Sequence, residues 1–203
     1  MTTRPARRLT AAAGIAALAL LVSSCGGSDD PVAQPTPSSA APTTSAPTSS
    51  SVVPVSAEDQ AVTEATEAVS QFYAAIDRIN ADRNSDPDTL HDVTTGDAYL
   101  AQVRQAVQMK ARGLTQIGNG RVVDATPFSI DLTTDAGANP PKFPTVVMDA
   151  CLDVGDVNVV DAEGKSVVPA TRLAQTTARL NVVHFDFGWR VDKIASSGEP
   201  CAL

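Results

Sequence analysis

The chain has 203 residues, enough for one ordinary domain with appended segments. Its formal charge of −8 at pH 7, from 23 acidic and 15 basic residues, argues against nucleic acid as a partner. Such partners need clustered Lys and Arg to neutralise their phosphates. Aromatic residues make up only 4% of the chain, so Val, Leu, Ile and Ala are expected to fill the core.

Residues 1–24 have the layout of an export signal. Basic residues come first, and an apolar run from Leu9 to Val22 follows, which only Thr10 and Gly14 interrupt. The run is shorter than the roughly 20 residues that a helix needs to cross the hydrocarbon core of a bilayer. We therefore predict a signal peptide that is removed, rather than a membrane span.

The end of this run resembles the bacterial lipobox, in which an aliphatic residue and two small residues precede a lipidated cysteine. Val22 is the aliphatic residue here, and Ser23 and Ser24 are the small ones. The resemblance implies cleavage before Cys25, acylation of its sulfur with chains such as palmitate, and attachment to the outer face of the cell membrane. A plain secretory signal with an incidental cysteine is the alternative.

Residues 25–55 form a segment rich in Pro, Ser and Thr. Such a composition cannot bury enough apolar area to offset the entropy of ordering, so we predict a disordered tether after the lipidated Cys25. Where extended, a Pro-rich chain rises about 3.1 Å per residue, so the tether could hold a domain tens of ångströms from the bilayer. Its hydroxyl groups could also carry sugars, although a plain linker is the simpler interpretation.

The folded domain is expected over residues 56–203, and its first part has the period of helices. Ser56 can cap a helix that ends near Asn80. A short helical turn is predicted at 88–93, and a second helix at 97–112. The apolar stripe expected to face the core from this second helix consists of Tyr99, Leu100, Val103 and Val107.

Beyond Gly113 the apolar residues alternate, which is typical of strands. The predicted strands are 121–133, 144–154, 173–186 and 189–194. Pro127 indicates an edge strand or a bulge, since proline cannot donate to a sheet ladder. In the first strand, Phe128, Ile130 and Leu132 are expected on one face. Helices followed by an antiparallel sheet define the α+β class.

This order of elements, together with the terminal hairpin Gly188-Trp189-Arg190-Val191, resembles the nuclear-transport-factor-2-like, or SnoaL-like, cone fold. More narrowly, residues 150–154, this hairpin and Glu199-Pro200-Cys201 look like the tail of secreted actinobacterial lipoproteins of unassigned function. The resemblance covers about residues 57–203 and implies helices packed on a curved, cone-shaped antiparallel sheet. Enzymes, ligand carriers and assembly modules all use this fold, so the resemblance alone implies no activity.

Cysteine usage indicates a disulfide bond. With Cys25 assigned to lipidation, Cys151 and Cys201 form an even pair in an exported chain. Alternation places Cys151 on the polar face of its strand, so a bridge would pin the C-terminal tail against the outer side of the sheet. Two free thiols or a metal pair are the alternatives, although zinc sites use clusters of ligands that this pair lacks.

The sequence offers two histidines as candidate catalytic groups. His91 lies in a short polar segment and is interpreted as an exposed loop residue. His184 falls on the apolar face of its strand, where it either makes a quiet hydrogen bond or lines a pocket. No phosphate-binding loop, zinc-helix motif or nucleophile elbow is found, so we assign no catalytic, cofactor-binding or metal residue.

Two functions remain open at this stage. The first is a non-enzymatic envelope module, anchored to the membrane through the lipid on Cys25, that binds an envelope protein or a small apolar ligand. The second is a SnoaL-like isomerase, cyclase or hydrolase that uses His184 as acid or base. A cone interior with an open pocket and a carboxylate near His184 would favour the enzyme, whereas an interior filled by side chains would favour the module.

Overall fold

The computed structural model describes residues 55–201. The predicted signal peptide, the lipidation site Cys25 and nearly all of the predicted tether lie outside these residues. These three assignments therefore stay predictions. The folded domain is described by itself below.

Helical segments come first in the domain and strands follow, which confirms the predicted α+β class. The helical segments are α1 (Ala57–Ala81), the 3-10 helix η1 (Pro87–Asp92) and α2 (Gly96–Ala111). The strands are β1 (Thr115–Ile117), β2 (Arg121–Asp131), β3 (Thr145–Asp153), β4 (Asn158–Val160), β5 (Gln175–Phe185) and β6 (Gly188–Ser196). The three-residue strands β1 and β4 were not predicted, because three residues are too few to show an alternating pattern.

The start of α1 is determined by its local sequence. The Ser56 hydroxyl accepts a hydrogen bond from the backbone N–H of Asp59 at 3.0 Å, as the sequence predicted. Glu58 and Asp59 place negative charge in the first turn, and Arg78 places positive charge in the last, so both ends complement the helix dipole. The buried stripe then keeps one face of the helix against the sheet.

The apolar stripe predicted for α2 is wrong in part. Leu100 and Val107 are 57% and 53% exposed, whereas the small residues Ala98 and Ala106 are buried. The reason is close packing, because α2 begins at Gly96 with a φ of +52°, where a Cβ atom would collide with the Asp192 side chain of β6. At this close approach Ala98 packs against the sheet, whereas Ala106 packs with Ala75, Ile79 and Leu90 of α1 and η1. Tyr99 and Val103 are partly buried on that second cluster as predicted, and Leu100 and Val107 point outward.

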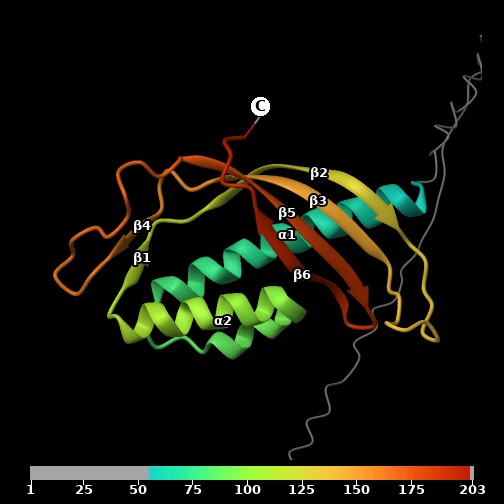
Figure 1. The fold of residues 1–203 in the computed structure, drawn as a ribbon, viewed down its shortest axis with the longest axis horizontal. Helices are drawn as coiled ribbons and strands as arrows, with labels where there is room; N and C mark the ends of the chain where they lie inside the picture. The colour runs from blue at the N-terminus through green and yellow to red at the C-terminus, as the bar shows by residue number, and fades with distance from the viewer. Residues whose placement is uncertain (1–54, 202–203) are drawn as a thin grey trace, which may run out of the picture. The chain divides into compact units, whose positions relative to one another are not determined.

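Four strands form one antiparallel sheet in the order β2-β3-β5-β6, and β1 pairs with β4 in a separate two-stranded sheet. Figure 1 shows the long strands curving over the helices, with α1 and α2 on one side of the sheet. We call the side that faces α1 the inner face and the opposite side the outer face. Helices packed on a curved antiparallel sheet are the arrangement predicted from the sequence.

The inner face is filled by side chains. Phe72 and Val69 of α1 pack with no exposed area against the middle of the sheet. The residues of the strands that meet them alternate along the chain, as the sequence predicted. They are Val146, Met148, Ala150 and Leu152 of β3, Ala178, Leu180 and Val182 of β5, and Val191 of β6.

The edge strand β2 differs from its prediction at one residue. The pairing of β2 with β3 shifts register between Pro127 and Ser129, which leaves Phe128 unpaired. Phe128 therefore lies on the outer side, where the guanidinium of Arg179 stacks over its ring at 3.6 Å. The prediction that Phe128 shares the face of Ile130 is wrong because the bulge reverses the alternation.

The predicted disulfide between Cys151 and Cys201 is present. Cys151 lies on the outer face of β3, and the tail after β6 crosses over it. Backbone hydrogen bonds hold the tail beside β5, since the N–H of Thr177 donates to the carbonyl of Glu199 at 3.0 Å, and the N–H of Ser197 donates to the carbonyl of Thr177 at 3.1 Å. The tail is thus fixed to this end of the outer face.

Candidate functional site

His184 lies near the end of β5, opposite Trp189 in the β5–β6 hairpin. The two rings meet edge to face, with centroids 5.1 Å apart, and the backbone N–H of His184 donates to the carbonyl of Pro144 at 2.8 Å. The side chain is half-buried. The structure therefore places His184 at one end of the inner face, as alternation predicted.

A carboxylate that sequence reasoning missed lies close to this pair. The indole N–H of Trp189 donates to Glu64 of α1 at 2.8 Å. Glu64 follows Ala61 by three residues and precedes Ala68 by four, so it belongs to the buried side of the helix. This spacing is the signal that could have identified Glu64, although it does not indicate which strand residue it meets.

The chemistry of Glu64 is that of an ionised hydrogen-bond acceptor. Its pKa is lowered, first by the hydrogen bond from the Gln60 side chain, next by that from Trp189, and slightly by the charge of His184. A general acid needs the opposite shift, with burial holding the proton on at neutral pH. Glu64 is therefore suited to fastening the hairpin to α1 rather than to donating a proton.

His184 is not part of any cavity described in this domain. The space between α1 and the sheet is occupied by Phe72, Met148 and Leu180. The middle of the inner face is therefore closed to a substrate, while His184 lies half-buried at its end.

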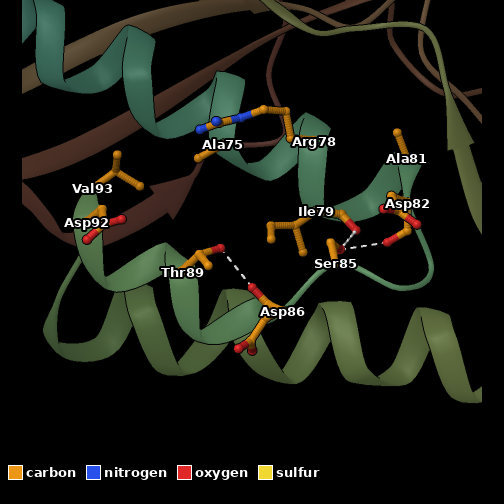
Figure 2. Close-up of a pocket in the computed structure, with 10 residues that line it drawn as sticks. All are labelled: Ala75, Arg78, Ile79, Ala81, Asp82, Ser85, Asp86, Thr89, Asp92 and Val93. Carbon is orange, nitrogen blue, oxygen red and sulfur yellow. Dashed lines mark hydrogen bonds between the residues drawn. The ribbon is translucent and has the colours of Figure 1, made fainter. Parts of the chain in front are cut away.

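The largest of the cavities, about 660 Å³, lies between the end of α1 and η1 (Figure 2). Several of its polar groups bond to the loop itself. The Ser85 hydroxyl donates to the carbonyls of Ile79 and Asp82, and the Thr89 hydroxyl donates to the carbonyl of Asp86. The Asp86 carboxylate caps η1 through the N–H of Asp88. These bonds shape the turn, and no histidine lines the cavity.

A second cavity, of about 540 Å³, lies between α1 and the start of β2 and contains Asp77. Burial raises the pKa of Asp77, although two hydrogen bonds oppose the shift. The Gln116 amide donates to one oxygen at 2.6 Å, and the N–H of Gly120 donates to the other at 3.0 Å. Because both oxygens are engaged, Asp77 fastens α1 to β1 and to the turn that follows it.

The remaining sequence candidates show no site chemistry. His91 lies in η1, is exposed, and stacks on Tyr99 with ring centroids 3.7 Å apart. Within residues 55–201 no three His, Cys, Asp or Glu side chains are grouped to hold a metal ion. In the same residues no helix is both long and apolar enough to span a bilayer.

The outer side of the sheet carries most of the phenylalanines. Of five in the chain, only Phe72 belongs to the core. Phe143, Phe185 and Phe187 lie at the end of the sheet that contains the β5–β6 hairpin, and we call these three the aromatic cluster. Phe185 lies 5.1 Å from Phe143 and 5.2 Å from Phe187 between ring centroids. Phe187 is 65% exposed and Phe143 is 41% exposed.

Comparison with known proteins finds little. No protein-family model matches the chain. No curated protein matches it either. The solved structures that it resembles include the intermembrane space region of the chloroplast protein ARC6, with a TM-score of 0.47 and 14% identity over 66% of this chain and 95% of that one. A protein of Novosphingobium aromaticivorans described as an aromatic ring hydroxylase gives 0.37 and 14%, over 68% and 94%. With both TM-scores below 0.5, neither likeness carries an argument about this chain.

Proposed function

We propose that this chain is a cell-envelope lipoprotein, anchored through lipid on Cys25 to the outer face of the membrane. Its folded domain is a non-enzymatic interaction module related to the SnoaL-like cone fold. The Pro/Ser/Thr-rich tether of residues 25–55 joins the lipid to the domain. The proposed location at the membrane rests on the lipobox resemblance. The proposed role as an interaction module rests on how side chains pack against the sheet.

The observation that carries the module is the contrast between its interior and its surface. The space where a cone-fold enzyme holds its substrate is filled by Phe72, Met148 and Leu180, none of which has any exposed area. Apolar side chains are instead concentrated at the surface in the aromatic cluster. Contiguous exposed apolar groups mark contact sites more often than isolated ones do.

The same packing favours a partner at the surface over a small apolar ligand inside the cone. It also weighs against the alternative, a SnoaL-like enzyme that uses His184. A pocket in which a base and a carboxylate converge is the physical requirement for that enzyme. Glu64 does lie near His184, but its lowered pKa and its bond to Trp189 suit a structural role.

Two measurements test the proposal. Cells grown with radiolabelled palmitate should label the wild-type protein, and Cys25→Ala should abolish the label and release the protein into the medium. In a deletion strain, His184→Ala should restore the wild-type phenotype, whereas Phe185→Ser combined with Phe187→Ser should not. If His184→Ala folds normally and fails to restore the phenotype, the result favours the SnoaL-like enzyme over the interaction module.

A further inference from the structure

Two of the three rings in the aromatic cluster, those of Phe187 and Phe143, are exposed, and the guanidinium of Arg190 lies over the Phe187 ring at 5.2 Å. Phe187 stands in the tight turn between β5 and β6, a position that usually holds polar or small residues. Beside the cluster is a cavity of about 430 Å³, lined in part by Pro140, Pro141 and Phe143. The loop before β3 and the hairpin thus present one apolar surface to the outside.

The position of the cluster in the domain indicates what covers it. The Glu64–Trp189 hydrogen bond fastens the first half of α1 to the β5–β6 hairpin. Glu64 is seven residues after Ala57, which corresponds to about 10 Å along a helix. The start of α1 and the hairpin accordingly lie at the same end of the domain, as Figure 1 shows. The end that joins the tether is therefore the end that carries the phenylalanines.

We propose that the aromatic cluster inserts into the lipid surface to which the chain is anchored. This inference rests on the proposed lipidation of Cys25. A flexible coil of the tether's length has a root-mean-square span of about 30 Å, and extended proline-rich stretches lengthen that span. A bilayer held at that average distance has a high effective concentration, so a contact that is weak in solution becomes populated.

The charges around the cluster balance, so insertion of the rings rather than electrostatic attraction would hold the contact. Three basic and three acidic residues lie on the hairpin or line the neighbouring cavity. They are Lys142, Arg190, Lys193, Asp131, Asp186 and Asp192. The contact should therefore depend little on salt.

A second copy or another protein is a less suitable occupant. Stable protein interfaces bury about 1,200 to 2,000 Å² in total. A phenylalanine side chain contributes about 200 Å² when fully covered. The exposed parts of Phe143 and Phe187 together therefore supply only about 200 Å², well below the area of a stable protein interface. A few exposed rings at a loop tip suffice for insertion at an interface, where no complementary protein surface is required.

The test uses Trp189, the only tryptophan of the chain, as a reporter two residues from Phe187. Protein that begins at Cys25 is coupled through this thiol to a maleimide lipid in vesicles of phosphatidylcholine and phosphatidylglycerol, 3:1. Cys25 is the one cysteine outside the disulfide, so coupling is specific. Vesicles with brominated acyl chains are compared with unbrominated vesicles, because bromine quenches a nearby indole.

We expect brominated lipid to lower Trp189 fluorescence at least twofold in the coupled wild type, in low salt and in 0.5 M NaCl alike. Phe185→Ser combined with Phe187→Ser should remove this quenching. The control Val107→Ser, at an apolar residue of α2 that is 53% exposed against 65% for Phe187, should retain it. Near-UV circular dichroism checks that each variant is folded. Equal quenching in the double variant and the wild type would overturn the proposal.

Two further outcomes are informative. Because Trp189 faces α1, a chain with Trp189→Phe and Phe187→Trp places the same reporter in the cluster itself, and no quenching of that coupled chain would exclude membrane contact. Self-association of uncoupled protein, lost in the double variant, would assign the cluster to a second copy instead. Because the coupling is chemical, the result does not depend on acylation in cells. A failure of palmitate labelling would therefore refute the lipoprotein assignment separately from this contact.

Discussion

The inner and outer faces of the four-stranded sheet are built from alternate residues of the same strands, yet the inner face is packed and the outer face is largely exposed. On β5 the inner residues Ala178 and Leu180 have almost no exposed area, whereas Arg179 between them is exposed and pairs with Asp149. The inner face holds the fold together through close packing. The outer face carries the disulfide at one end and the aromatic cluster at the other, so residue type alone does not show what a side chain contributes.

The largest expected difference between the faces concerns two phenylalanines. Phe72→Ala should lower the free energy of unfolding by about 4 kcal/mol, because it leaves a cavity in a fully packed core. Phe187→Ala should change it by no more than about 0.5 kcal/mol, since the ring is mostly exposed. Urea unfolding followed by far-UV circular dichroism measures both. Similar losses in the two variants would refute the distinction between a packing face and a contact face.

The disulfide is the outer face's expected contribution to stability. Replacing Cys151 and Cys201 together by Ala should cost about 4 kcal/mol, because the bridge closes a loop of 50 residues in the unfolded chain. Differential scanning calorimetry gives the shift in Tm, and a reducing agent should lower the Tm of the wild type but not of the double variant. A Tm that is insensitive to the bridge would mean that the tail does not stabilise the sheet.

The smallest expected effect concerns two carboxylates, Asp149 and Asp77, whose contributions to the free energy of unfolding should change in opposite directions with pH. The hydrogen bonds from Arg179 lower the pKa of Asp149, so its stabilisation is present above the unfolded-state pKa and is lost as pH falls through the lowered folded value. Burial raises the pKa of Asp77, so the folded state binds that proton more tightly and stability from this group increases as pH falls.

Unfolding free energies between pH 6 and pH 2 test this difference. Relative to wild type, Asp149→Asn should be destabilised at pH 6 and should approach the wild-type value at the lowest pH. Asp77→Asn should remove the contribution of Asp77, which increases the free energy of unfolding as pH falls. The same direction of change in both variants would contradict the assignment of the two environments.

The sequence predicted those parts of the fold that depend on long, regular patterns. The α1 stripe, the Ser56 cap and the alternation in β3 and β5 are local properties, so they can be read along the chain. The stripe of α2 could not be read in this way. Whether Leu100 or Ala98 faces the sheet depends on how closely the helix approaches β6, which is a property of two segments far apart in sequence.

The candidate site was less predictable for the same reason. Alternation placed His184 on the inner face, but the hydrogen bond between Glu64 and Trp189 joins residues 125 positions apart. The bulge at Pro127 was suggested by the proline, while its effect on Phe128 was not. The cluster of Phe143 with Phe185 and Phe187 forms because the loop before β3 and the β5–β6 hairpin lie at the same end of the sheet.

The two edges of the sheet also bear on how the protein behaves when crowded. Along β6, the N–H of Thr95 donates to the carbonyl of Val191, and the N–H of Val191 donates to that of Val93, so the chain before α2 covers part of this edge. Along β2, Pro127 and two register shifts interrupt the ladder. Neither margin offers a long, flat strand to a neighbouring molecule, so many copies could be concentrated on one surface without polymerising through their backbones.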